Sequence, residues 1–401
     1  MHATAIPASA EPSSADSGLT IRGTAWQRVG VISSVRPSEL DLTNWDLGGP
    51  VSEWSYRHAA ELFETRRLAP GTRVSESSRA VDSKIPADLA EELGSGRVAA
   101  ITILAGGRTV FRWPDGPTVP QLLMSVSKII ASLAIGLLAD ADKINYADPV
   151  RDVLPELGNQ WQGCSVRHVL DMTSGVACPE VGDPGAYSDP GHPFYRFEAS
   201  LGWRPPDRTT SPYELVLGYG RTGEPGTRYR YTSVNTFLLA WIVERVTDLS
   251  YVDALQRLIW DGLALAQDSA LCVNRAGVPV AHGGLIMTVD DLARFGTMFT
   301  RTPGPNTLRV PDSYLEMLHD PRPELVAPTR SWPAEAHPGG QWNLIHPDGD
   351  LYKSGFGGQG LYVSPANDVV IAFGGVPDEH GRTHRLADKC RGLAVRFADS
   401  N

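Results

Sequence analysis

The stretch that decides the fold is residues 125–142, SVSKIIASLAIGLLADAD. It is apolar on nearly every face over about four turns, with no Gly or Pro before Gly136, which predicts a helix buried between other elements. It opens with Ser125-Val-Ser-Lys128, and this spacing of three places both polar side chains on one helix face. A lysine in the first turn of such a helix is unfavourable with the helix dipole and costly to bury. The free-energy cost of placing Lys128 there suggests that this lysine has a function.

Nucleophilic catalysis is one such role. Burial disfavours the charged form of a lysine, and the neutral amine of Lys128 could then take the proton of the Ser125 hydroxyl as a base. Such a pair makes an acyl-enzyme nucleophile. An N-cap serine beside a lysine that reaches solvent is the alternative, because five lysines give an S-x-x-K pattern several chances to occur.

Strands are expected at both ends of the chain's main domain. Residues 97–104 and 108–113 are β-rich and joined through Ala-Gly-Gly, which predicts a hairpin. Residues 361–363 return to a strand pattern, and residues 369–373 form a second one after a Pro-Ala-Asn-Asp turn. The expected fold class is therefore α/β of the α+β type, an antiparallel sheet flanked by helices.

Helical patterns fill the middle of the chain. They cover residues 165–172, 235–246 and 288–299, the last opening with a capping-box spacing from Thr288 to Asp291. We expect an inserted all-helical lobe at about residues 146–280.

Two further short motifs could carry chemistry. Tyr231-Thr-Ser233 follows a Pro-Gly turn, and a tyrosine held beside two lysines ionises more easily and can shuttle a proton. Lys353-Ser-Gly355 enters the C-terminal strands, where a cation, a hydroxyl and a glycine can hold a carboxylate or carbonyl and aim the next N–H at an oxyanion. A core tyrosine and a polar strand edge are the structural alternatives.

Two patterns near the C-terminus are set aside. Residues 355–360 match G-x-G-x-x-G but run into a strand instead of opening a helix, so a dinucleotide site is not expected. His380 and His384 have metal-ligand spacing without a third ligand nearby. The sequence contains neither G-x-S-x-G nor H-E-x-x-H, which excludes the α/β-hydrolase and zincin classes.

Composition limits the partners. The net charge of −10, from 36 basic and 46 acidic residues, and the scattered basic side chains disfavour nucleic acid. The absence of an export signal or long apolar run predicts a cytoplasmic protein that does not bind membranes. Four widely spaced cysteines predict reduced, buried thiols, and we expect no metal and no cofactor.

Three parts are expected along the chain. Residues 1–18 form a disordered tail, and residues 19–95 form an extension packed on the core, with helices near residues 56–66 and 86–93. Residues 96–398 form the main domain.

The motifs S-x-x-K, Y-x-S and K-S-G, in this order, resemble those of the serine β-lactamase and penicillin-recognising superfamily, in its class C and esterase branch. The intervening segments VRHVLDMTSGV, PGTRYRYTS and AHGGLIMTVDDLARF are similar to segments of that branch. Within it, LLMSVSK, LAWIVERVT and GQGLYVSP resemble the nylon-oligomer hydrolase group. The resemblance implies a β-lactamase/transpeptidase-like fold.

The resemblance also implies roles for individual residues. Ser125 would be the nucleophile, Lys128 its base and Tyr231 the proton shuttle, with the backbone N–H groups of Ser125 and Phe356 as the oxyanion hole. The residues it implies for substrate binding are Tyr187, Glu198, Trp203, Ser233, Lys353, Ser354 and Gly355. Tyr187, Glu198 and Trp203 would belong to one irregular loop, residues 187–203, that covers the pocket.

Two departures from the family pattern bear on the substrate. Class C β-lactamases carry Asn where this chain has Ser233, which places antibiotic hydrolysis in doubt. The nylon-oligomer group has a different sequence at Lys353-Ser-Gly355. We therefore expect a serine hydrolase of small esters or linear amides such as 6-aminohexanoate oligomers. An acyltransferase and a non-catalytic penicillin-binding-like protein are the alternative functions. The expected partner is a small ester or amide substrate, and a homodimer is left open.

Overall fold

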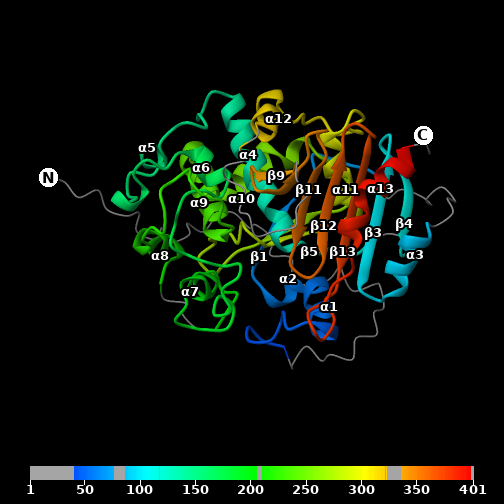
Figure 1. The fold of residues 1–401 in the computed structure, drawn as a ribbon, viewed down its shortest axis with the longest axis horizontal. Helices are drawn as coiled ribbons and strands as arrows, with labels where there is room; N and C mark the ends of the chain where they lie inside the picture. The colour runs from blue at the N-terminus through cyan, green and yellow to red at the C-terminus, as the bar shows by residue number, and fades with distance from the viewer. Residues whose placement is uncertain are drawn as a thin grey trace, which may run out of the picture.

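The computed structural model of the protein describes residues 40–75, 86–116, 118–205, 210–320, 322 and 336–398. Its main feature is a seven-stranded antiparallel sheet in the order β4-β3-β13-β12-β11-β10-β9 (Figure 1). The strands are β3 (Val98–Ala105), β4 (Arg108–Trp113), β9 (His337–Gly339), β10 (Trp342–Ile345), β11 (Leu351–Gly355), β12 (Gln359–Ser364) and β13 (Val369–Gly375). The fold class expected from the sequence is confirmed.

The two predicted strand pairs are both present. β3 and β4 form the expected hairpin, and β12 pairs with β13 across a turn in which the Asp368 N–H donates to the Pro365 carbonyl at 3.2 Å. β3 also pairs with β13 along its length, for example Ile103 with Ile371. The N-terminal hairpin and the C-terminal strands, which are far apart in the sequence, therefore lie side by side within one sheet.

Helices cover both faces of this sheet. Successive side chains of a strand point to opposite faces, and in β13 Val370 and Ala372 belong to one core while Ile371 and Phe373 belong to another. The first face packs against α11 (Val289–Gly296) and the second against α3 and α13. The bounds are α3 (Ala87–Gly94) and α13 (Leu386–Ala398). The predicted cap is confirmed, since the Thr288 hydroxyl accepts from the Asp291 N–H at 3.0 Å.

The predicted central helix is α4 (Lys128–Asp140), preceded by a 3₁₀ turn at Met124–Ser127. Its residues from Lys128 to Gly136 are all buried, and a Cβ on Gly136 would lie 2.5 Å from a ring carbon of Tyr314 in α12 (Asp312–His319). This glycine lets the two helices approach closely. The first nine residues of α4 therefore belong to the core, and Ser125 lies half-buried in the turn just before the helix.

The helices that follow α4 lie together to one side of the main sheet (Figure 1). The lobe expected at about residues 146–280 is helical as far as residue 258 but is not all-helical, because strands occur at Ala264–Leu265 and Ser269–Cys272. They are α5 (Val150–Val153), α6 (Val166–Leu170), α7 (Pro193–Ser200), α8 (Pro212–Gly218), α9 (Ser233–Thr247) and α10 (Tyr251–Leu258). Single 3₁₀ turns occur at Asn159–Trp161, Trp260–Gly262 and Thr297–Phe299.

A second, four-stranded sheet has the order β1-β7-β8-β5. It comprises β1 (Thr65–Leu68), β5 (Gln121–Leu122), β7 (Ser269–Cys272) and β8 (Leu285–Met287), while β2 (Thr72–Arg73) pairs in parallel with β6 (Ala264–Leu265). The helix expected near residues 56–66 is present only in part. The end of α1 (Gly49–Arg57) and α2 (Ala59–Leu62) fall within this range, but β1 begins at Thr65 and pairs with β7. Long-range strand pairing overrides the local pattern there. The helix expected at residues 86–93 is present as α3.

The N-terminal segment packs into the same core as the helices. Trp45 lies edge-on to Trp203 at 5.2 Å between ring centroids, and its indole N–H donates to the Trp203 carbonyl at 3.1 Å. The tail expected at residues 1–18 lies outside the described residues. All four cysteines are buried and unpaired by disulfides. None of the helices in the described ranges is long and apolar enough to cross a membrane.

Candidate active site

A strained turn presents Ser125 at the start of α4. The preceding residue, Met124, has a φ of 50°, a left-handed conformation that residues other than glycine seldom adopt. Ser127 holds this turn, because its hydroxyl donates to the Met124 carbonyl at 2.7 Å and accepts from the Leu285 N–H of β8 at 3.0 Å. Ser125 itself is half-buried, so it is not closed off from solvent.

Lys128 is fully buried and lies within hydrogen-bond distance of three oxygens. Its Nζ is 3.0 Å from the Ser125 Oγ, 3.0 Å from the Ser233 Oγ and 2.9 Å from the His282 carbonyl oxygen. Burial lowers the pKa of the Lys128 ammonium to about 8. A substantial fraction of this lysine is therefore neutral near physiological pH.

The three contacts indicate where the lone pair of the neutral amine lies. A carbonyl oxygen can only accept, so one N–H of Lys128 must point at His282. When the second N–H points at Ser233, the lone pair faces Ser125, whose hydroxyl then donates to Nζ. This arrangement is the one that a base needs in order to take the serine proton.

Tyr231 lies between two lysines. The Nζ atoms of Lys128 and Lys353 are 5.1 and 5.3 Å from its ring centroid, within the range of cation–π contacts. The Pro-Gly turn before Tyr231 is hydrogen-bonded to the loop that follows α6. There the Gly226 N–H donates to the Thr173 carbonyl at 2.9 Å. The structure thus brings together all three motifs that the sequence singled out.

The end of β11 closes the other side of Ser125. Lys353 is fully buried, and Ser354 is turned to β10, where its N–H and hydroxyl both lie within 3.0 Å of the Asn343 side-chain oxygen. Gly355 has no room for a side chain, because a Cβ there would lie 2.5 Å from the Leu123 carbonyl oxygen. Glycine therefore allows β11 to approach the turn that carries Ser125.

A buried carboxylate that the sequence analysis missed lies behind this group. Glu180 accepts from the N–H of Ser233, the first residue of α9, at 2.6 Å and from the Tyr187 hydroxyl at 3.3 Å. A carboxylate is favourable at a helix N-terminus, so Glu180 helps to fix Ser233 beside Lys128. Its negative charge also opposes the lowering of the Lys128 pKa.

Two exposed aromatic rings lie against each other beside the site. Tyr187 and Phe356 are 44% and 52% exposed, and their rings stack with centroids 6.5 Å apart and an interplanar angle of 18°. Tyr187 belongs to the segment between Glu180 and α7, whereas Phe356 follows β11. The pair therefore connects the helical side of the molecule to the strand that ends beside Ser125.

Two residues implied for substrate binding are placed in the core. Trp203 is 1% exposed and packs against Trp45, Phe63 and the His282 ring, so the expectation of Trp203 on an irregular loop over the pocket is corrected. Tight aromatic packing leaves its ring without solvent access. Glu198 lies on α7, a regular helix, and is 5% exposed.

The Glu198 carboxylate belongs to a buried charge network. Its Oε2 is 3.0 Å from the Arg204 Nε, and its Oε1 is 3.6 Å from the His282 Nε2. Arg204 in turn forms two hydrogen bonds to Asp46. Burial favours the neutral acid, but the His282 ring and Arg204 outweigh it and hold the pKa of Glu198 below its usual value. A contact between Glu198 and substrate stays a prediction.

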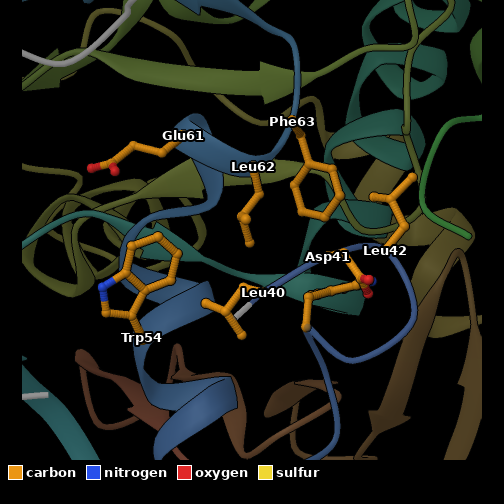
Figure 2. A pocket seen from close by; sticks show the side chains of 8 residues that line it. Leu40, Asp41, Leu42, Trp54, Glu61, Leu62 and Phe63 are labelled. Atoms are coloured by element: carbon orange, nitrogen blue, oxygen red, sulfur yellow. The ribbon is translucent and has the colours of Figure 1, made fainter. Parts of the chain in front are cut away.

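A separate pocket of about 330 Å³ lies on the N-terminal segment (Figure 2). Its lining residues are Leu40, Asp41, Leu42, Trp45, Trp54, Glu61, Leu62 and Phe63. None of these residues belongs to the motifs around Ser125, so this pocket is distinct from the candidate active site. Within the described ranges no group of three or more His, Cys, Asp or Glu side chains could hold a metal ion.

Comparison with known proteins defines the class to which this fold and site belong. The Beta-lactamase family pattern matches residues 87–375, and the chain belongs to that family. It is a serine hydrolase of the β-lactamase fold.

Individual relatives narrow the resemblance further. The chain is 31% identical over 366 residues to the 6-aminohexanoate-dimer hydrolase of Paenarthrobacter ureafaciens, covering 86% of this chain and 90% of that protein. A Bacillus anthracis structure described as "Putative 6-aminohexanoate-dimer hydrolase" has a TM-score of 0.75 at 21% identity, covering 90% of this chain and 97% of its own. EstCE1, "a hydrolase with promiscuous acyltransferase activity", has a TM-score of 0.57 at 15% identity, covering 77% and 95%. The predicted relationship to the nylon-oligomer hydrolase group is confirmed.

Proposed function

We propose that this protein hydrolyses small linear amides and esters through an acyl-enzyme on Ser125. The observation that carries the proposal is the 3.0 Å contact between the Ser125 Oγ and the Nζ of a fully buried Lys128. Lys128 takes the hydroxyl proton while the Ser125 Oγ bonds to the carbonyl carbon of the substrate. The carbonyl oxygen becomes an oxyanion, which the N–H groups of Ser125 and Phe356 stabilise.

The intermediate then collapses with departure of the amine or alcohol. Tyr231 passes a proton to the leaving group and regains one from Lys128, consistent with its place between the two lysines. Water next attacks the acyl carbon and gives its proton back through the same groups, which releases the acid and restores the Ser125 hydroxyl. No proton is gained or lost by the enzyme over the cycle.

Linear substrates are favoured over β-lactams. The Ser233 hydroxyl lies 3.0 Å from the Lys128 Nζ, and Ser233 has no side-chain amide with which to contact a substrate side-chain amide as Asn would. Losing one buried hydrogen-bond partner costs about 1–3 kcal/mol, which is enough to slow a competing substrate. The relation to a 6-aminohexanoate-dimer hydrolase supports a substrate of the 6-aminohexanoate-oligomer type.

A substrate panel tests this proposal. Wild-type protein and Ser125→Ala are assayed with short p-nitrophenyl esters, 6-aminohexanoate dimer and nitrocefin. We expect ester and dimer turnover that depends on Ser125, and much slower nitrocefin turnover. Nitrocefin turnover equal to that of the esters would contradict the preference for linear substrates.

Acyl transfer is the second candidate function. The stacked rings of Tyr187 and Phe356 present an exposed apolar surface next to the proposed oxyanion hole, where an alcohol or amine could compete with water for the acyl group. Product analysis with and without added amines distinguishes the two reactions. Conjugated products at millimolar acceptor would favour transfer, and free acid alone would favour hydrolysis.

A further inference from the structure

The short connection between β11 and β12 carries half of the proposed oxyanion hole. It consists of Phe356, Gly357 and Gly358 between the ends of the two strands. Gly357 and Gly358 have φ angles of 80° and 91°, conformations that side chains rarely adopt. The G-x-G-x-x-G pattern of the sequence therefore describes a tight, glycine-rich turn. Glycine is intrinsically flexible, so something else must fix the direction of the Phe356 N–H.

One side chain contacts this turn from the C-terminal segment. The His384 Nε2 lies 2.9 Å from the Gly358 carbonyl oxygen, and the His384 Nδ1 accepts from the Leu386 N–H at 3.3 Å. Because Nδ1 accepts, Nε2 carries the proton and donates it to Gly358. The ring is 7% exposed and lies edge-on to Phe373 of β13 at 5.3 Å, so its position is fixed by packing.

A second side chain contacts the turn from the N-terminal segment. Tyr56 of α1 is 2% exposed, and a Cβ on Gly357 would lie 2.5 Å from its Cε2 atom. Its ring packs in turn against Trp45, with centroids 6.4 Å apart. The turn is thus confined by a hydrogen bond at Gly358 and by an aromatic ring at Gly357. The two contacts come from opposite ends of the chain.

We propose that His384 and Tyr56 are positioning residues that hold the Phe356 N–H in the direction of the acyl oxygen. The inference rests on the proposed acyl-enzyme on Ser125. An oxyanion-hole donor works only when it is aimed in advance at the place where charge develops. Since the oxyanion exists in the transition state and not in the bound substrate, loosening the turn lowers kcat more than it changes KM.

The imidazole is suited to this task over a wide pH range. Burial lowers the pKa of His384, opposed by the Gly358 bond and by Glu92, with Arg97 adding to the lowering. The neutral ring is the form that can donate to Gly358 and accept from Leu386 at once. The turn therefore stays held while Lys128 titrates.

The test compares three histidine variants in the full-length protein. His384→Leu removes the donor, His384→Gln keeps an N–H at a similar distance, and His380→Leu changes an exposed histidine of the same segment. With a p-nitrophenyl ester we expect kcat of His384→Leu to fall about 10- to 100-fold with KM within about twofold. His384→Gln should recover most of kcat, and His380→Leu should match wild type.

Two variants of Tyr56 provide an independent test if His384→Leu does not fold. Tyr56→Phe keeps the ring against Gly357 and should keep kcat, whereas Tyr56→Ala should lower it with KM nearly unchanged. Thermal unfolding of each variant establishes that it is folded at the assay temperature.

The outcomes separate this inference from the proposed function. Full kcat in both His384→Leu and Tyr56→Ala, with Ser125→Ala inactive, would overturn the positioning role alone. A His384→Gln rate no better than that of His384→Leu would also overturn it, because Gln restores the hydrogen-bond donor that Leu lacks. An active Ser125→Ala enzyme would instead overturn the proposed function.

Discussion

The two sides of Ser125 are organised by different kinds of interaction. On the side of Lys128, buried polar atoms meet at hydrogen-bond distances, and two carboxylates, Glu180 and Glu198, lie near enough to influence the lysine. On the side of Phe356, the chain is a glycine turn shaped by close packing against Tyr56 and by one bond from His384.

Because of this difference, we expect the two sides of the site to respond differently to pH and to substitutions. The Lys128 side depends on charge and protonation, so its function varies with pH and with neighbouring carboxylates. The Phe356 side depends on backbone direction, so its function varies with steric fit. Substitutions on the first side should alter pH profiles, and substitutions on the second should alter kcat at every pH.

The largest expected effect comes from removing the reacting groups themselves. Ser125→Ala, Lys128→Ala and Tyr231→Phe should each lower kcat on the order of 10³-fold or more, and double variants should lose little beyond that, because the three act as one unit. Ester turnover by purified variants measures this. A Ser125→Ala enzyme with a near wild-type rate would show that Ser125 is not the nucleophile, and the comparison of its two sides would then have no bearing on catalysis.

A steric change should come next in size. Gly357→Ala introduces a Cβ 2.5 Å from the Tyr56 ring at a φ of 80°, so the turn must shift. We expect kcat to fall about 100-fold, the scale of losing one oxyanion-hole donor, with the same fold-change at pH 7 and pH 9. Gly381→Ala, at a glycine with open space around it, is the matched control for strain at a positive φ. A pH-dependent loss in Gly357→Ala would indicate that the two sides are not separate.

The pH dependence of kcat/KM tests the Lys128 side of the site. Lys128 accepts the serine proton only when neutral, so kcat/KM should rise about tenfold per pH unit below pH 8 and level off above it. The charge of Glu180 raises the Lys128 pKa. Glu180→Gln should therefore move the rising limb to lower pH, while the groups that also face Lys128, namely Tyr231, Lys353, His282 and Glu198, are unchanged. A shift to higher pH, or no shift, would contradict this sign.

The smallest expected effect concerns substrate charge. If the buried Glu198 carboxylate attracts an ammonium group, Glu198→Gln should raise KM for 6-aminohexanoate dimer about three- to tenfold and leave KM for a neutral ester within about twofold. The assay is run on the high-pH plateau, where a changed Lys128 pKa no longer matters. An equal response of both substrates would assign Glu198 to the charge network with Arg204 and Asp46 alone.

Much of the Lys128 side could be predicted from sequence because its residues belong to short motifs. The S-x-x-K spacing places Ser125 and Lys128 together on consecutive turns, and the order of the three motifs indicates that Tyr231 and Lys353 join them. The buried helix, the hairpin and the C-terminal strands were also predictable, since each depends on a local pattern of apolar residues.

The rest depends on contacts between distant parts of the chain. Glu180 belongs to a loop with no recognisable motif, and only the fold brings its carboxylate to the N-terminus of α9. His384 looked like an isolated half of a metal-ligand pair, and its partner is a backbone carbonyl 26 residues away. Trp203 was expected beside substrate, but the aromatic rings of the N-terminal segment bury it. Sequence motifs indicate which residues react, whereas tertiary packing decides which residues position them.

The central claim is that Ser125 forms a covalent intermediate with Lys128 as its base. Intact-mass spectrometry after incubation with a fluorophosphonate probe, followed by peptide mapping, tests it directly. The account predicts one adduct per chain, located on Ser125, absent in Ser125→Ala, and forming faster as pH rises through about 8 in step with the Lys128 pKa. An adduct on another residue, or none on folded wild-type protein, would contradict it.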